Sequence, residues 1–159
     1  MYRTVNDFLA DCSVATKGTL QALEALTDDK LGQAITEGHN TLGWLGWHLA
    51  GSPIFFGGQL GLNVVPVGDM RTVPAHASEI VDGYRKITEN ITNEVKQNLT
   101  DENIVENVDS AFGSIPRGAL LRSMIDHQTH HRGQMTVLLR QAGLPVPGVM
   151  GPTKEQQMK

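Results

Sequence analysis

Apolar side chains recur at intervals of three and four residues through most of this 159-residue chain, the spacing that places them on one face of an α-helix. Turn-favouring and capping residues divide the chain into four such segments, predicted as helices over about 4–26, 41–60, 75–99 and 116–142. No segment alternates cleanly enough to predict a β-strand. The pattern therefore predicts an all-α fold, with the helices packed as one bundle in a single domain spanning 1–159.

Several residues set the expected ends and irregularities of these helices. Asn40 is a candidate N-cap of the second helix, and Pro53 is expected to kink that helix or to unwind it locally. Pro116 suits the first turn of the fourth helix, with Ser114 as a nearby capping candidate. The segment 143–159 is rich in proline and glycine, so we expect it to pack as an extended strap.

Charge and cysteine content narrow the class of protein. The formal net charge is −4 and the lysines and arginines are scattered, so nothing in the sequence indicates a nucleic-acid partner. The single cysteine, Cys12, excludes an internal disulfide, and the first seven residues lack an apolar signal core. We therefore expect a cytoplasmic protein.

The uncharged stretch 42–62 is about long enough to span a bilayer. It contains His48, Ser52, Pro53 and Gln59 together with six glycines, and no lysine or arginine anchors flank it. A buried helix of a soluble bundle is the better interpretation, so we expect no membrane association. The glycines also permit close approach of backbones, either inside the bundle or across a dimer seam.

Two histidines of the fourth predicted helix lie four residues apart, so His127 and His131 share one face, one turn apart. At about 100° per residue they fall within a stripe of core-type residues, namely Leu120, Met124, Met135 and Leu138. A third histidine, His48, lies near the centre of an apolar face of the second helix, which also carries Trp44, Leu45, Ser52 and Phe55. Burying three imidazoles is costly unless their ring nitrogens find partners.

Two interpretations of these histidines stay open. Each could be a core histidine hydrogen-bonded to a neighbour, or all three could bind one metal ion, which also removes the repulsion between protonated neighbours. We favour the metal, and three protein ligands would leave one coordination position open, as in reactive sites. His130 and Asp126 fall about 100° from the stripe, and His39 and His76 lie near helix starts, so these four are not expected to be ligands.

The donor set limits the metal. Three imidazoles suit zinc, nickel, iron or copper, whereas Mg²⁺ and Ca²⁺ prefer carboxylate clusters that do not accompany these histidines. The motif is not that of a zinc protease, because Gln128 stands where such a motif requires a glutamate base.

Three segments together resemble the DinB-like (DinB/YfiT) superfamily. Residues 127–134 with 138–143 resemble its helix-four signature, residues 40–50 its helix-two signature, and residues 145–153 the tails of some members. The resemblance implies a four-helix bundle in up-down-down-up order, often a homodimer. It also implies a divalent metal, commonly nickel or zinc, on His48, His127 and His131.

Superfamily members of known activity act as thiol-dependent transferases or isomerases that use glutathione, mycothiol or bacillithiol. The resemblance thus implies a metal-dependent thiol S-transferase with a low-molecular-weight thiol and an electrophilic substrate. Cys12 lies on an apolar stripe and is not expected to supply the thiol. Candidates for a polar lining, each more readily explained as structural or surface residues, are Ser52, Tyr84, Gln128 and Arg132.

Two other functions stay open from the sequence. The chain could be a non-enzymatic metal-binding protein, induced by stress or damage, in which the ion holds the bundle together. It could also be an interaction module in which the glycine-rich second helix forms the seam of a dimer.

Overall fold

Four long helices make up most of the computed structural model, which describes residues 1–157. They are α1 (Val5–Glu24), α2 (Leu42–Gln59), α3 (Ala77–Asn98) and α4 (Arg117–Gln141). Shorter elements are the 3-10 turn η1 (Asp28–Lys30), the strands β1 (Asn107–Ser110) and β2 (Gly113–Pro116), and α5 (Lys154–Gln157). The predicted all-α bundle is confirmed, and each long helix lies within two residues of its predicted bounds.

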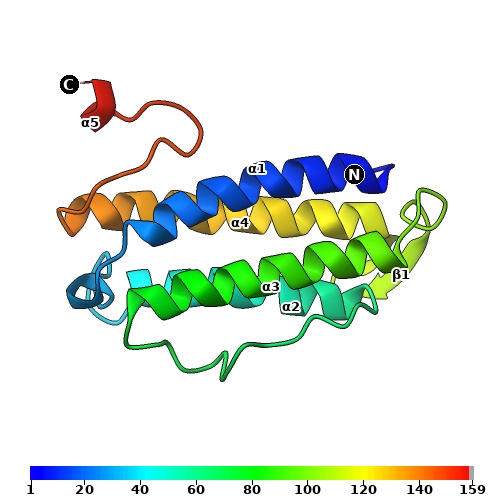
Figure 1. Ribbon diagram of the computed structural model, residues 1–159, viewed down its shortest axis with the longest axis horizontal. Helices are drawn as coiled ribbons and strands as arrows, with labels where there is room; N and C mark the ends of the chain where they lie inside the picture. The colour runs from blue at the N-terminus through cyan, green and yellow to red at the C-terminus, as the bar shows by residue number, and fades with distance from the viewer. Residues whose placement is uncertain (158–159) are drawn as a thin grey trace.

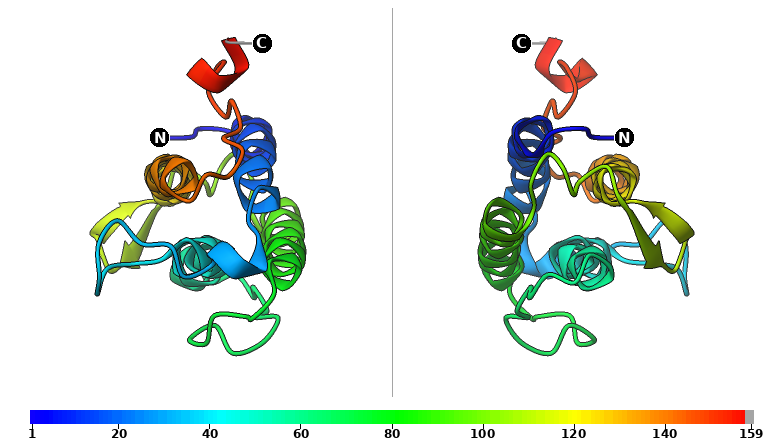
Figure 2. Two further views of the ribbon diagram at one scale, coloured as in Figure 1. Left: turned by 90° about the vertical axis from the view of Figure 1, so that its left-hand side faces the viewer. Right: turned by 90° about the vertical axis from the view of Figure 1, so that its right-hand side faces the viewer.

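The helices run in the up-down-down-up order that the resemblance implies. In Figure 1, α1 runs in one direction, α2 and α3 both run in the opposite direction, and α4 returns parallel to α1. The long connection over 60–76 carries the chain back along the bundle, so that α2 and α3 are parallel. The end views of Figure 2 show a square arrangement in which α2 lies between α3 and α4. The α2–α4 pair therefore forms one side of the bundle.

Helical periodicity accounts for the core. The predicted α3 stripe is fully buried, since Ile80, Tyr84, Ile87, Ile91 and Val95 have no exposed surface. On α4, the predicted stripe is also buried at Leu120, Met124, Met135 and Leu138. Burying such side chains contributes about 1.5–3 kcal/mol each and drives the helices together. Among residues 1–157, no helix combines the length and apolarity that crossing a bilayer requires.

Pro53 lies inside α2 without ending it, so the expected local unwinding is wrong. A proline cannot donate the backbone hydrogen bond to the carbonyl four residues earlier, here that of Leu49. The hydroxyl of Ser52 donates to the Leu49 oxygen instead, at 3.1 Å. This bond satisfies the carbonyl that Pro53 leaves free, and α2 continues to Gln59.

The helix caps differ from two predictions. Thr41, rather than Asn40, caps α2, because its hydroxyl accepts a hydrogen bond from the Trp44 backbone at 3.1 Å. Ser114 does not cap α4; it lies in β2, opposite Asp109. Pro116 is the N-cap residue of α4, one position before the expected first turn.

The sequence did not predict the hairpin β1–β2. Its strands are four residues long, too short for a clear alternation of polar and apolar side chains. Gly113, with a φ of 90°, adopts the backbone conformation that ends its two-residue turn. At the tip of the turn, the ring of Phe112 stacks over that of Phe56 on α2, with centroids 6.2 Å apart.

The tail is only partly the extended strap that was predicted. Val146 packs into the core, but residues Lys154–Gln157 form the short helix α5. An ion pair between Arg140 and Glu155, with Nε and Oε1 2.7 Å apart, joins α5 to the end of α4. The last two residues of the predicted strap, 158 and 159, lie outside the described part of the chain.

The glycines of α2 allow close packing inside the bundle. A Cβ atom on Gly46 would lie 3.0 Å from Ile80, and one on Gly57 would lie 2.4 Å from Val64. Gly43 similarly lets α2 approach Leu31 in the preceding connection. Internal packing therefore accounts for these three glycines, and they are not available as a dimer seam.

Candidate metal centre

The antiparallel packing of α2 and α4 brings together the three histidines singled out from the sequence. His48 lies on α2, and His127 and His131 lie one turn apart on α4. All three side chains are partly buried at the α2–α4 seam. Their ligating nitrogens lie within 4.8 Å of one another, so the cluster could hold a metal ion.

The distances between ring nitrogens fit one shared ion. The Nε2 atom of His127 lies 3.0 Å from that of His48 and 3.2 Å from that of His131. Zinc–imidazole bonds are about 2.0–2.1 Å long, so two nitrogens on one tetrahedral ion lie roughly 3.4 Å apart, and closer where the angle is narrower. When three ring nitrogens face one another, a single proton between them cannot hydrogen-bond all three lone pairs. A metal cation can bind all three.

The surroundings keep these imidazoles neutral, which is the form that binds metal. Burial, followed by the neighbouring His131, His48 and His130, lowers the pKa of His127 to about 4. Burial and His131 also lower the pKa of His48. Burial lowers the pKa of His131, although its hydrogen bond to Gln134 opposes that shift.

Gln134 fixes the orientation of His131. Its Oε1 lies 2.7 Å from Nδ1 of His131. An amide oxygen only accepts, so Nδ1 carries the proton and the Nε2 lone pair faces the cluster. Metal-binding histidines usually have such a partner on the second nitrogen. The Nδ1 atom of His127 is buried and, within residues 1–157, has no hydrogen-bond partner.

Aromatic rings form the walls around the cluster. The Trp44 indole stacks on the His48 ring with centroids 4.6 Å apart and planes 11° apart. At the other end, Phe56 lies edge-on to His127 at 5.7 Å, and Phe55 and Phe112 extend this wall outward. Trp44, Phe55 and Phe112 are exposed and the three histidines are only partly buried, so the cluster lies close to the protein surface.

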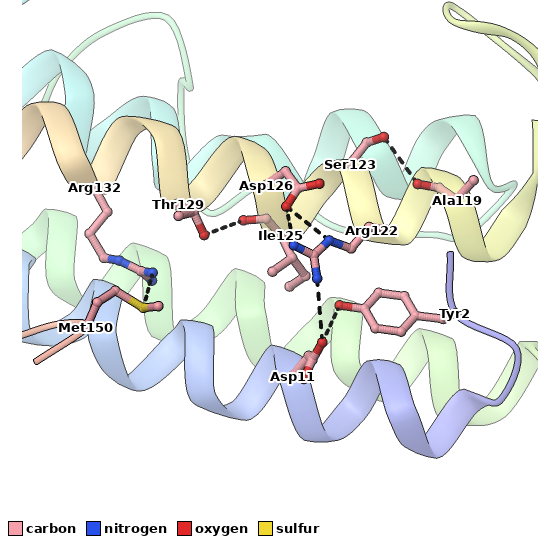
Figure 3. A network of polar contacts seen from close by, with 10 residues as sticks. All are labelled: Tyr2, Asp11, Ala119, Arg122, Ser123, Ile125, Asp126, Thr129, Arg132 and Met150. Atoms are coloured by element: carbon pink, nitrogen blue, oxygen red, sulfur yellow. Dashed lines mark hydrogen bonds and ion pairs between the residues drawn. The ribbon is translucent and has the colours of Figure 1, made fainter.

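The histidines and the carboxylate that were set aside lie outside the cluster. His130 is exposed and is not one of the converging side chains. Asp126 accepts a hydrogen bond from Arg122 at 3.0 Å, as Figure 3 shows, and is not one of the converging side chains. His39 is exposed, and His76 begins α3, with its Nδ1 2.8 Å from Asp28.

The four candidates for a polar lining are structural. Ser52 hydrogen-bonds the Leu49 carbonyl within α2. Tyr84 and Thr19 donate hydrogen bonds to Oε1 of the buried Gln128 at 2.7 and 3.2 Å. Arg132 is only 3% exposed and donates to the backbone oxygen of Ala15 at 3.0 Å. Its second terminal nitrogen points to the Met150 sulfur at 3.9 Å (Figure 3).

Cys12 is buried between α1 and α3, and burial raises the pKa of its thiol. A buried, protonated thiol is a poor nucleophile, as expected from its place on an apolar stripe.

The structure adds residues that sequence analysis missed. A cavity of about 340 Å³ lies beside the cluster, lined by Gln134 and by Leu45, Val137 and Leu138 of the same two helices. The loop before α2 completes the cavity with Ile35, Gly38, His39 and Asn40. Helical spacing from His131 could have found Gln134, but the loop residues meet α4 only in the folded protein.

A scan against protein families matches the DinB family model over residues 1–158. The chain belongs to the DinB family. It is 36% identical to an uncharacterized protein, YrdA, of Bacillus subtilis (strain 168), over all of this chain and 95% of that protein. It is also similar to the crystal structure of a DinB-like protein from Bacillus cereus ATCC 10987, with a TM-score of 0.88 and 40% identity over 93% of this chain and 99% of the other.

Two more distant structures share the fold. A DinB-like protein from Bacillus subtilis, YjoA, has a TM-score of 0.71 at 17% identity over 92% of this chain and 99% of that one. A mycothiol-dependent maleylpyruvate isomerase has a TM-score of 0.54 at 17% identity, covering 82% of this chain and 60% of the other. These likenesses show the bundle architecture.

Proposed function

We propose that this DinB-family protein binds one divalent transition-metal ion, nickel or zinc, through Nε2 of His48, His127 and His131. The observation that carries the proposal is the convergence of these three nitrogens, 3.0 and 3.2 Å apart along the chain of contacts. Their neutral state and the bond from His131 to Gln134 support it. Without an ion, the three nitrogens would lie close together with too few protons between them to form hydrogen bonds.

We further propose that the protein is a metal-dependent thiol S-transferase. An ion held by His48, His127 and His131 would leave a coordination position for a thiolate sulfur and would lower the pKa of that thiol, so that the nucleophile would exist at neutral pH. The partial exposure of the three histidines supports this proposal because a soluble thiol could reach them, whereas Cys12 is buried elsewhere. The thiol dependence of the structurally similar maleylpyruvate isomerase points to the same chemistry.

The reaction would join the thiol sulfur to an electrophilic carbon. The sulfur forms the new bond, the leaving group departs with its electron pair, and the thiol proton passes to solvent. The three histidines would hold the ion, while Gln134 orients His131 and Trp44 covers one face of His48. Phe56 packs edge-on against His127 and is itself covered by the ring of Phe112.

The test is transfer of glutathione, bacillithiol or mycothiol to 1-chloro-2,4-dinitrobenzene, followed by absorbance of the thioether. We expect turnover that requires nickel or zinc, is lost in His131→Ala and is retained in the adjacent control His130→Ala. Turnover that survives complete metal removal, or that is equal in the two variants, would contradict the proposal.

The second candidate is a non-enzymatic metal-binding stress protein. It is favoured by one observation: the ligands come from two helices, so an ion would cross-link α2 to α4. Binding would then stabilise the fold by about 2.7 kcal/mol when free metal is 100-fold above Kd. Metal-dependent stabilisation with no transfer to any of several electrophiles would favour this candidate over the transferase.

Three further expectations accompany the transferase. We propose that 1–159 acts as a single domain, that the protein is a cytoplasmic homodimer, and that it has no nucleic-acid partner. The dimer is supported by the family alone, because internal contacts account for the close-packed α2 glycines Gly43, Gly46 and Gly57. Light scattering on the metal-loaded protein tests the dimer.

A further inference from the structure

The cavity of about 340 Å³ beside the histidine cluster has a distinct chemistry. Its walls carry four aliphatic side chains, those of Ile35, Leu45, Val137 and Leu138. Its polar groups are the neutral amides of Asn40 and Gln134 and the imidazole of His39. In the part of the chain that the structure describes, no aspartate, glutamate, lysine or arginine side chain lines it.

Gln134 links the cavity to the histidine cluster. This residue lines the cavity and also holds His131 through the 2.7 Å hydrogen bond to Nδ1. Along α4, Gln134 lies about 4.5 Å and Leu138 about 10 Å beyond His131, from a rise of about 1.5 Å per residue. On the facing helix, Leu45 lies one turn from His48 and lines the same cavity. A ligand with its donor atom at the cluster would therefore extend into this cavity.

The loop that forms the outer wall of the cavity is fixed at its base by backbone hydrogen bonds. The loop over 31–41 is closed by a bridge between Ala34 and Thr41, and the Leu42 backbone donates to the Gln33 oxygen at 2.8 Å. Next to this bridge, the loop presents Ile35, which is 60% exposed and lines the cavity together with Val137, which is 46% exposed. Both side chains would lose contact with water if an apolar group entered the cavity.

We propose that this cavity binds the uncharged, largely apolar body of the ligand whose sulfur reaches the metal, and that it selects against ligands with a carboxylate at that position. The inference rests on the proposed function. Apolar walls gain free energy from an aliphatic or aromatic group, and the amides of Asn40 and Gln134 can hydrogen-bond one or two neutral polar groups. A carboxylate would lose hydration there without meeting a cationic side chain.

The probes are two thiols of nearly equal shape that differ in charge. 3-Methylbutane-1-thiol carries a branched methyl pair where 3-mercaptopropionate carries two carboxylate oxygens. Each is titrated into the cobalt-substituted protein at pH 8, and binding is followed by the sulfur-to-cobalt charge-transfer band. We expect 3-methylbutane-1-thiol to bind at least about tenfold more tightly, since burying the branched group is worth about that factor.

Two matched variants test whether the preference for the uncharged thiol arises in the cavity. Val137→Lys brings a cation into the cavity and should reduce the ratio of the two affinities at least about fivefold. Val14→Lys makes the same change on α1, at a position that is 71% exposed and does not line the cavity, and should leave the ratio unchanged. Should Val137→Lys fail to load cobalt, Ile35→Lys in the same cavity gives the same test.

Equal affinities for the two thiols in the unmodified protein, or a ratio that both cavity variants leave unchanged, would overturn the cavity assignment while the transferase proposal stands. Failure of both thiols to produce the band would overturn the proposed function and, with it, this inference.

Discussion

Two faces of α4 carry polar side chains at neighbouring positions, and they differ in how those polar groups are satisfied. On the face toward α1 and α3, Gln128 and Arg132 are almost fully buried, and their hydrogen bonds go to Tyr84, Thr19 and a backbone carbonyl. On the face toward α2, His127 and His131 are only partly buried, and their Nε2 atoms point at one another and at His48. The polar groups of the first face are paired within the protein, whereas the three ring nitrogens of the second face converge and could hold a cation.

The difference separates structural from functional polar residues on one helix. A side chain whose donors and acceptors are paired inside the fold contributes stability and specificity. Lone pairs that converge near solvent are instead available to a ligand. We therefore expect changes on the α1–α3 face to alter stability, and changes on the α2 face to alter metal binding.

The largest expected effect is on metal affinity. Changing His131 to alanine removes one of three ligands and should weaken nickel or zinc binding at least about 100-fold, while the apo protein keeps its stability. His130→Ala, one residue away on the exposed side, should change the affinity less than about threefold. Calorimetric titration of both apo variants makes the measurement, and equal losses in the two would reverse the ligand choice.

The opposite face should respond in stability alone. Gln128→Ala leaves the hydroxyls of Tyr84 and Thr19 without their acceptor and creates a small cavity, so the free energy of unfolding should fall by about 2–4 kcal/mol. The control Thr129→Ala removes a hydroxyl that bonds only the Ile125 carbonyl of its own helix, 3.0 Å away, and should cost under about 1 kcal/mol. Urea unfolding of the apo proteins gives both values. A large loss of metal affinity in Gln128→Ala would break the separation of the two faces.

Protonation of His127, on the face of α4 toward α2, should make the stability of the apo protein depend on pH. The pKa of His127 is about 4 in the folded protein against 6.5 for the free side chain, so the unfolded chain binds more protons between these values. The free energy of unfolding should therefore fall as the pH drops from about 6.5 to about 4, and should be flat with respect to this group above 6.5. Allowing for solvent at the partly exposed ring, the loss is about 1–2 kcal/mol.

Thermal unfolding of the apo protein across this pH range provides the measurement. The variant His127→Gln should show a smaller slope over the same range, since it lacks the titrating group. An identical slope in the two proteins would contradict the assignment of this pH dependence to His127.

The smallest effect is expected at Gln134, which orients a ligand without binding the ion. Gln134→Ala should weaken metal binding about tenfold, the usual cost of removing a partner of a ligating histidine. The variant Gln134→Glu retains an acceptor for Nδ1 of His131 and should restore most of the affinity. A tenfold loss in both variants would mean that the hydrogen bond does not matter.

The sequence predicted the parts of the molecule that depend on helical periodicity. The α3 stripe from Ile80 to Val95 is buried as the spacing requires, and the helical phase separated His127 and His131 from His130. The up-down-down-up order came from the family resemblance, because spacing along a helix carries no information on its direction in the bundle.

The features that the sequence did not predict depend on individual hydrogen bonds, on short elements and on contacts between distant segments. Ser52 makes a hydrogen bond to the carbonyl that Pro53 leaves free, so the helix stays regular where proline alone predicts a kink or local unwinding. The strands β1 and β2 are too short for their alternation to be recognised. Ile35 and His39 meet Gln134 and Val137 only because α2 and α4 pack antiparallel, so no spacing could have indicated the cavity.

The central claim is that His48, His127 and His131 bind one ion through their Nε2 atoms. The most direct test is an anomalous difference map from crystals of the nickel-loaded protein, collected on both sides of the nickel absorption edge. The account predicts a single strong peak about 2.0–2.2 Å from all three Nε2 atoms, with His130 and Asp126 outside bonding distance. A fully loaded crystal with no peak among the three rings, or with a peak bound by other side chains, would contradict it.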